Sequence, residues 1–175
     1  AVSSRAPAAR KSLIWIPVAT SLLLAALLFR RFGTSRPGSN DLIAEVVLTD
    51  HVRSLVADNL TDVASTDNHT VKPWFQGRLS FSPGVPDLSN EGFVLTGGWL
   101  DMVRRTPAAA IIYKRRNHVI NLFVAPATQP DSQPRAQKSK GYNLVAWIKG
   151  GLGYWAVSDL NAEELMHFAE LARSR

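Results

Sequence analysis

Apolar residues are spread unevenly along the chain, and a long, mostly apolar run without any charge, LIWIPVATSLLLAALLF, covers residues 13–29. A run that is apolar on every side is typical of a helix surrounded by lipid or by a protein core. At about 1.5 Å per residue this helix would be roughly 25 Å long, the short end of what crosses a hydrocarbon layer. Trp15 near one end suits the membrane interface. The pattern therefore predicts a single transmembrane helix.

Two other structures are compatible with a run of this kind, a buried core helix and a cleaved signal peptide. A core helix is disfavoured because basic residues stand on both sides of the run. A signal peptide is disfavoured because no small-x-small cleavage site follows, and the chain continues directly as RRFGTSRPG. We therefore expect a retained span over residues 13–29, followed by a linker over residues 30–40.

Helical spacing returns at both ends of residues 41–175. The first helix should begin at Asp41 and fade near Asn59. Its apolar stripe would consist of Leu48, Val52, Leu55 and Val56. The last helix should begin at Asn161, because Glu164 stands three residues later and completes a capping box. Leu160 and Leu165 are placed for the hydrophobic staple that accompanies such a box.

Between the two helices, alternation and turn residues indicate about five antiparallel strands. The β-rich segments are residues 71–81, 92–102, 108–126 and 142–157. Residues 108–126 should form a hairpin that turns near Arg116 and Asn117, and 142–157 a hairpin that turns at KGGLG. The Gly97-Gly98 pair suggests a bulge, and residues 127–140 lack large apolar side chains and predict a long loop. No βαβ spacing occurs, so the sequence predicts an α+β domain with both helices on one sheet face.

Charge adds to the membrane prediction. The formal net charge is +6, with 20 Lys and Arg against 14 Asp and Glu. Six of the basic residues and none of the acidic ones lie in residues 1–40, so the remaining 14 basic and 14 acidic residues cancel. A basic excess confined to the flanks of an apolar run is typical of a membrane segment and disfavours nucleic acid as a partner. Three basic residues stand on each side, so charge does not set the orientation.

Candidate chemistry is sparse. The absence of cysteine excludes disulfides, thiol catalysis and cysteine-based zinc sites. The four histidines are His51, His69, His118 and His167. None of their spacings is that of a metal site, and no nucleophile elbow or phosphate-binding loop occurs. The sequence therefore predicts no metal, no cofactor and no enzymatic activity, with His51 and His167 on polar helix faces.

Two short motifs remain. KRRNH at the first hairpin tip could contact lipid headgroups or an acidic partner, but a solvated turn is favoured. In HTVKPWFQG, Trp74 and Phe75 should point to opposite sides of a strand, so that at most one of them enters the core. Packing is favoured there over ligand contact. If a pocket exists, its candidate residues are His69, Lys72, Trp74 and, on a neighbouring strand, His118.

Five ordered segments resemble the extracytoplasmic part of bacterial transmembrane anti-sigma factors. They are HVRSL (51–55), STDNHTVKPWFQGRLSFSPGVPDL (65–88), GFVLTGGWLD (92–101), AAIIYKRRNHVINLFVAP (109–126) and GYNLVAWIKGGLGYWAVSDL (141–160). The resemblance implies a cytosolic stub at residues 1–12, an inner-membrane span at 13–29 and a periplasmic domain at 41–175. In that family a cytosolic zinc-type domain holds a sigma factor inactive. Only 12 residues precede the span and they hold no His/Cys cluster, so sigma binding would need a domain not present in this chain.

The sequence thus predicts a membrane-anchored, anti-sigma-factor-like regulator whose periplasmic domain senses or relays an envelope signal to transcription. The alternative is a periplasmic binding or envelope-assembly module that is anchored in the inner membrane and has no transcriptional role. The membrane is a partner under both hypotheses, and a sigma factor, reached through a separate cytosolic domain, only under the first.

Overall fold

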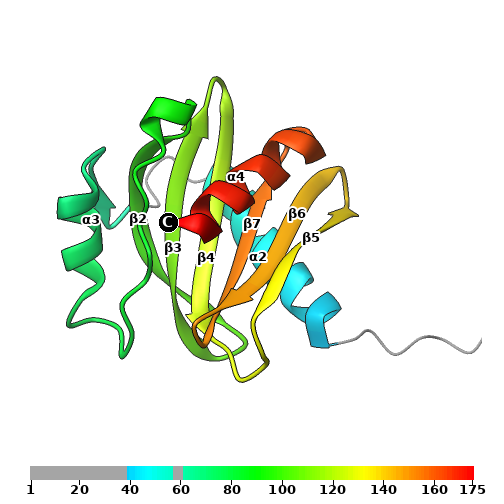
Figure 1. Cartoon of the computed structure of the whole chain (residues 1–175), viewed down its shortest axis with the longest axis horizontal. Helices are drawn as coiled ribbons and strands as arrows, with labels where there is room; N and C mark the ends of the chain where they lie inside the picture. The colour runs from blue at the N-terminus through cyan, green and yellow to red at the C-terminus, as the bar shows by residue number, and fades with distance from the viewer. Residues whose placement is uncertain (1–38, 57–60) are drawn as a thin grey trace, which may run out of the picture. The chain divides into compact units, whose positions relative to one another are not determined.

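A computed structural model describes residues 39–56 and 61–175 of the chain (Figure 1). The predicted cytosolic stub, the predicted span at 13–29 and residues 30–38 of the predicted linker lie outside the described residues. Ser39 and Asn40, assigned to the linker from the sequence, already belong to the first described helix. Among the residues described, no helix combines the length and the apolar character that crossing a membrane requires.

The described part is an α+β domain built on one antiparallel sheet of seven strands, in the order β1-β2-β3-β4-β7-β6-β5. The strands are β1 (Val63–Ala64), β2 (Val94–Val103), β3 (Thr106–Arg115), β4 (His118–Pro126), β5 (Ser132–Ser139), β6 (Tyr142–Lys149) and β7 (Leu152–Ser158). The helices are α2 (Ser39–Val56), α3 (Asn68–Phe75), the short 3₁₀ helix η1 (Ser89–Glu91) and α4 (Ala162–Ser174). The predicted fold class and the helices at both ends of the domain are confirmed, whereas the predicted strand number is too low.

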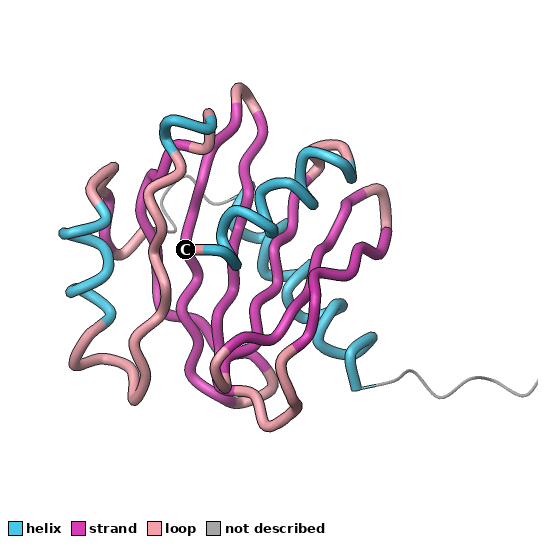
Figure 2. Tube along the Cα trace, viewed as in Figure 1, coloured by secondary structure: helices cyan, strands magenta, loops and turns pink. Residues whose placement is uncertain are grey.

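The sheet is covered on both faces, with α4 in front of it and α2 behind it in Figure 2. The core on the α4 side contains Leu122, Val124, Leu165 and Phe168, and the core on the α2 side contains Val47, Leu48, Phe123 and Trp155. The prediction that both helices share one face is therefore wrong. The reason is visible in β4, where residues 120–125 are all buried, since a strand that is apolar on both sides needs cover on both sides.

Helix α4 begins as the sequence predicts. The Asn161 side chain accepts a hydrogen bond from the Glu164 backbone N–H, and its amide donates to the Glu164 carboxylate, both at 2.8 Å. Leu160 and Leu165 are buried on either side of this cap. Phe168, one turn further on, packs edge-on against Tyr113 of β3 with ring centroids 5.1 Å apart. Capping and packing together fix the helix on the sheet.

Helix α2 uses a different face from the predicted one. Of the predicted stripe only Leu48 is buried, whereas Val52, Leu55 and Val56 are exposed. The residues in contact with the sheet side are Ala44, Val47, Leu48 and His51, which also follow helical spacing. The imidazole completes a stripe that a search for apolar residues alone does not detect.

The segment around Trp74 is a helix, so the strand predicted over residues 71–81 is wrong. Asp67 caps α3 by accepting a hydrogen bond from the His69 backbone N–H at 2.8 Å. Pro73 lies inside this short helix, where its missing N–H removes one helical hydrogen bond. Phe75 is fully buried, and the half-buried Trp74 packs against the same core, so the expectation that the two side chains point to opposite sides of a strand is wrong.

The loop predicted over residues 127–140 is wrong in its second half. Residues 132–139 form the edge strand β5, which pairs with β6 and has a register shift between Ser132 and Arg135. Pro134 lies at this irregularity. Most of the strand is exposed and it contributes no large apolar side chain, so the usual alternation signal is missing.

The predicted bulge at Gly97-Gly98 is confirmed by a register shift between β2 and β3 at Leu95 and Gly97. Gly97 has a φ of 144°, and a Cβ there would stand 2.2 Å from the Val63 carbonyl oxygen of β1. A Cβ at Gly98 would stand 2.9 Å from the Phe75 ring of α3. The two glycines of β2 therefore allow the edge strand β1 and helix α3 to pack close to the β2 backbone.

Candidate ligand-binding site

A cavity of about 380 Å³ opens on the α4 side of the sheet. It lies between α3, the loop that follows it, the β6–β7 hairpin and the end of α4. Its lining residues are Lys72, Ser82, Gly84, Val85, Pro86, Leu122, Lys149, Gly150, Leu152, Tyr154, Ala172 and Arg175. The volume falls within the range of small-molecule pockets.

One part of the lining is apolar. Leu122 of β4 and Val85 of the loop are buried, and Leu152 of β7 packs against the same core. Tyr154 contributes an aromatic wall and is itself stacked on Trp147, with centroids 5.1 Å apart and ring planes 3° apart. This wall is rigid because a second ring supports it from behind.

The other part of the lining is cationic. Lys72 is exposed and pairs with no carboxylate of the described residues. Lys149 donates from Nζ to the Arg173 carbonyl, so its charge lies at the end of α4 without a carboxylate partner within the described part of the chain. Arg175 donates to the Asp87 carbonyl, and its guanidinium is 3.9 Å from the Glu91 carboxylate. Among the described residues that line the cavity, three are cationic and none is acidic.

Two carboxylates near this lining, those of Asp87 and Asp131, are hydrogen-bonded to the backbone. Asp131 accepts a hydrogen bond from the Gly150 backbone N–H at 2.9 Å, and Asp87 accepts one from the Ser89 N–H at 3.0 Å. Hydrogen bonds from Ser89 also lower the pKa of Asp87, so this carboxylate stays charged. Burial, reinforced by the charge of Asp131, raises the pKa of Tyr154, which keeps its phenol neutral and able to donate.

Only one of the four residues proposed from the sequence lines this cavity. His69, Lys72 and Trp74 share α3, but Lys72 alone reaches the lining. His69 is exposed, and Trp74 packs edge-on against Phe75 with the Arg78 guanidinium 4.5 Å from its ring centroid. Trp74 therefore has a packing role, as the sequence favoured.

His118 begins β4, as predicted, but contacts a different region. Its Nδ1 lies 2.9 Å from a carboxylate oxygen of Asp159, just before α4. It makes no hydrogen bond to α3 among the described residues. The structure thus does not bring His118 together with the three α3 residues.

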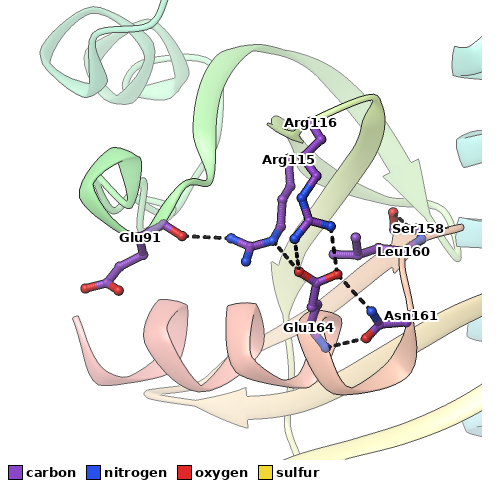
Figure 3. A network of polar contacts seen from close by, with 7 residues as sticks. All are labelled: Glu91, Arg115, Arg116, Ser158, Leu160, Asn161 and Glu164. Atoms are coloured by element: carbon purple, nitrogen blue, oxygen red, sulfur yellow. Dashed lines mark hydrogen bonds and ion pairs between the residues drawn. The ribbon is translucent and has the colours of Figure 1, made fainter.

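Arg115 and Arg116 of the KRRNH tip form, together with Glu164, a clamp that ties this hairpin to α4 (Figure 3). Arg115 and Arg116 both donate to Glu164 at 2.8 Å, and Arg115 also donates to the Glu91 carbonyl at 2.8 Å. The Arg115 guanidinium lies 4.4 Å from the Phe93 ring centroid. The expectation of a solvated turn is wrong for Arg115, whose side chain is only 20% exposed, whereas Arg116 is 66% exposed although it also donates to Glu164. Their shared partner lies 48 or 49 residues away and cannot be seen in the local sequence.

Buried polar side chains, which the sequence analysis did not predict, lie between α2 and the sheet. His51 is fully buried, its ring packs edge-on to Tyr142 at 5.2 Å, and neither ring nitrogen has a partner among the described residues. The predicted solvated position is wrong, whereas His167 is exposed as predicted. Burial lowers the pKa of His51 to about 4. On β4, Asn121 donates to the Ser54 hydroxyl of α2 at 2.6 Å.

The sequence missed Lys149, Tyr154 and Arg175 because the lining comes from several separate segments. A polar Asn121 inside the apolar run VINLFVA was the one local signal of the contact beneath α2. Within residues 39–56 and 61–175, no three His, Asp or Glu side chains converge as a metal site. Comparison of the chain with protein-family models, curated proteins and solved structures finds no match.

Proposed function

We propose that this chain is a membrane-anchored, anti-sigma-factor-like regulator whose periplasmic domain senses or relays an envelope signal to transcription. Residues 13–29 would anchor it in the bacterial inner membrane. The contact with a sigma factor would be made on the cytosolic side of the membrane. The periplasmic domain would change state when its signal arrives.

A single relationship on β4 supports the proposal. Leu122 lines the cavity on one face of the sheet, and its neighbour Asn121 holds Ser54 of α2 on the other face. Helix α2 is the first described element after the apolar segment, since it begins at Ser39. A ligand that displaces Leu122 would therefore act one residue away from the bond that seats α2, and α2 leads back along the chain to the anchor.

The buried groups beneath α2 suit a helix with two positions. The two ring nitrogens of His51 and the side-chain oxygen of Asn121 lack partners among the described residues, and a buried polar group without a partner is unfavourable. A helix that is held by a contact with unpaired polar atoms needs less free energy to move to a second position. This is the property required of an element that relays a signal.

The test compares transcription in the bacterium that carries the gene. We expect deletion of the gene to change the expression of a discrete set of genes that share promoters for one sigma factor. Ser54→Ala, which removes the partner of Asn121, should change the same set of genes. Thr49→Ala is the matched control, because Thr49 lies on the exposed side of the same helix and its hydroxyl donates to the Glu45 backbone carbonyl of that helix.

A transcriptome that is unchanged by deletion, with the protein shown to be expressed, would contradict the proposal. That result would favour the alternative, a periplasmic binding or envelope-assembly module without a transcriptional role. Protein levels and thermal melting of both variants would exclude a simple loss of folding.

A further inference from the structure

The cavity beside α3 combines two properties that few ligand classes match. Its apolar part, which includes Leu122 and Leu152, requires a ligand with an apolar body. Its cationic part, which includes Lys72 and Lys149, favours a ligand with a negative group. Asp87 and Asp131 accept hydrogen bonds from backbone N–H groups and form no ion pair with either lysine.

We propose that this cavity binds a small phosphate ester with an apolar body, and that such a molecule is the ligand through which the proposed regulator responds. A phosphate carries close to two negative charges at neutral pH, which matches the two lysines that lack carboxylate partners among the described residues. Lysine binds phosphate as a point charge and does not need the fixed geometry of an arginine fork. The neutral Tyr154 phenol adds a donor at the same wall.

Gly84 belongs to the lining of the cavity. A Cβ at this position would meet no atom nearer than the Tyr154 hydroxyl, at 4.0 Å. Larger side chains at residue 84 would therefore extend toward the aromatic wall without displacing the backbone. This position allows the cavity to be blocked without altering its charge.

A second cavity, of about 290 Å³, lies on the α2 side near Trp155. Its lining contains Ile43 and Val103 but only one cation, Arg104. Among the described residues, the second cavity therefore has one cation in its lining where the first has three. Variants of this second cavity therefore serve as controls that show whether an anionic aromatic probe binds in the first cavity.

The experiment uses the full chain in phosphatidylcholine nanodiscs and follows 4-fluorophenyl phosphate by ¹⁹F NMR line broadening. We expect saturable binding, at least tenfold tighter than that of the neutral 4-fluorophenol, with inorganic phosphate as a weak competitor. Lys72→Gln combined with Lys149→Gln should weaken binding at least tenfold. Gly84→Leu should abolish it, because its side chain would extend from a Cβ that lies 4.0 Å from the Tyr154 hydroxyl.

Two further variants act as controls. Lys138→Gln on the exposed strand β5 removes one charge outside the cavity and should change the dissociation constant less than twofold. Arg104→Gln changes the second cavity and should also leave binding unchanged. Thermal melting of each variant shows whether the fold is retained.

The proposal is overturned if the probe does not bind, if fluorophenol binds as tightly as its phosphate, or if folded Gly84→Leu and double-lysine variants still bind normally. Loss of binding in Arg104→Gln alone would also overturn it. Adding phosphatidic acid to the nanodiscs separates two natural sources of the ligand. Competition by this lipid would identify a lipid headgroup, and unchanged binding would identify a soluble ester.

Failure of this inference can be told apart from failure of the proposed regulatory function. Normal probe binding in a protein whose deletion does not affect transcription would retain the site and reject the regulator. A transcriptional effect of Ser54→Ala in a protein that does not bind the probe would retain the regulator and reject the ligand class.

Discussion

Arg115 and Glu164 are joined by a hydrogen bond of 2.8 Å between Nε and Oε1 although they are 49 residues apart in the chain. The bond ties the tip of the β3–β4 hairpin to the first turn of α4 (Figure 3). The same carboxylate accepts from Arg116 and from Asn161. One acidic side chain thus connects two elements that also enclose the Phe93 and Phe168 core.

Because of this clamp, the free energy of unfolding should depend on pH in the acidic range. The hydrogen bond from Arg115, followed by the charges of both arginines, lowers the pKa of Glu164. A lowered folded-state pKa stabilises the fold above the pKa of the unfolded chain, and this contribution is lost as the pH falls. We expect Glu164→Gln to lower the melting temperature at pH 6 and to converge with the wild type near pH 3. Glu163→Gln, exposed in the same turn, is the control, and identical pH profiles for the two variants would contradict the role of the clamp.

The cap of α4 can be tested separately from the clamp. Asn161→Ala removes the acceptor for the Glu164 backbone N–H and should destabilise the protein by about 1 kcal/mol in urea unfolding. Asn161→Asp keeps an acceptor at the same position and should retain most of the stability. Equal losses in the two variants would mean that the side chain acts by packing and not as a cap.

His51 should make the fold sensitive to mild acid. Its folded-state pKa of about 4 is below the unfolded value of 6.5, so the unfolded chain takes up a proton first as the pH falls. Stability is therefore unaffected above about pH 7 and declines between 6.5 and 4, by roughly 3 kcal/mol for the full shift. His51→Leu should remove this slope, whereas His167→Gln at an exposed site should keep it. Urea unfolding at pH 7, 6 and 5 measures the difference, and an unchanged slope in His51→Leu would refute it.

The sequence predicted the elements whose signals are local. The turn near Arg116, the Gly-rich turn of the β6–β7 hairpin and the Asn161 cap each depend on a few neighbouring residues, and all three are present. The strand prediction at α3 failed because Pro73 and the adjacent aromatic residues suggest an edge strand. In the structure the Asp67 cap and burial of Val71 and Phe75 favour a helix instead.

The site was less predictable than the fold. Lys72 was identified because it stands beside aromatic residues, but Lys149 and Arg175 reach the same cavity only after the sheet and α4 have packed. His51 appeared polar and exposed because the residues that bury it, including Tyr142, are distant in sequence. Long-range packing therefore determines both the positive cavity and the buried imidazole.

The position of Lys72 depends on a close contact at the edge of the sheet, and this gives a last prediction. A Cβ on Gly98 would stand 2.7 Å from the Ala110 carbonyl oxygen and 2.9 Å from the Phe75 ring. Gly98→Ala should therefore displace α3 and destabilise the protein by about 2 kcal/mol. The variant should also weaken binding of 4-fluorophenyl phosphate, although residue 98 does not line the cavity, because Phe75 and Lys72 belong to the same helix.

The matched control is Gly84→Ala, whose added Cβ meets only an ordinary contact at 4.0 Å and should change stability by less than about 0.5 kcal/mol. Urea unfolding and ¹⁹F titration of the two variants side by side separate the effects. If Gly98→Ala is as stable as Gly84→Ala and binds the probe equally well, the sheet edge tolerates a methyl group. Helix α3 would then be held in place by contacts other than the Gly98–Phe75 approach.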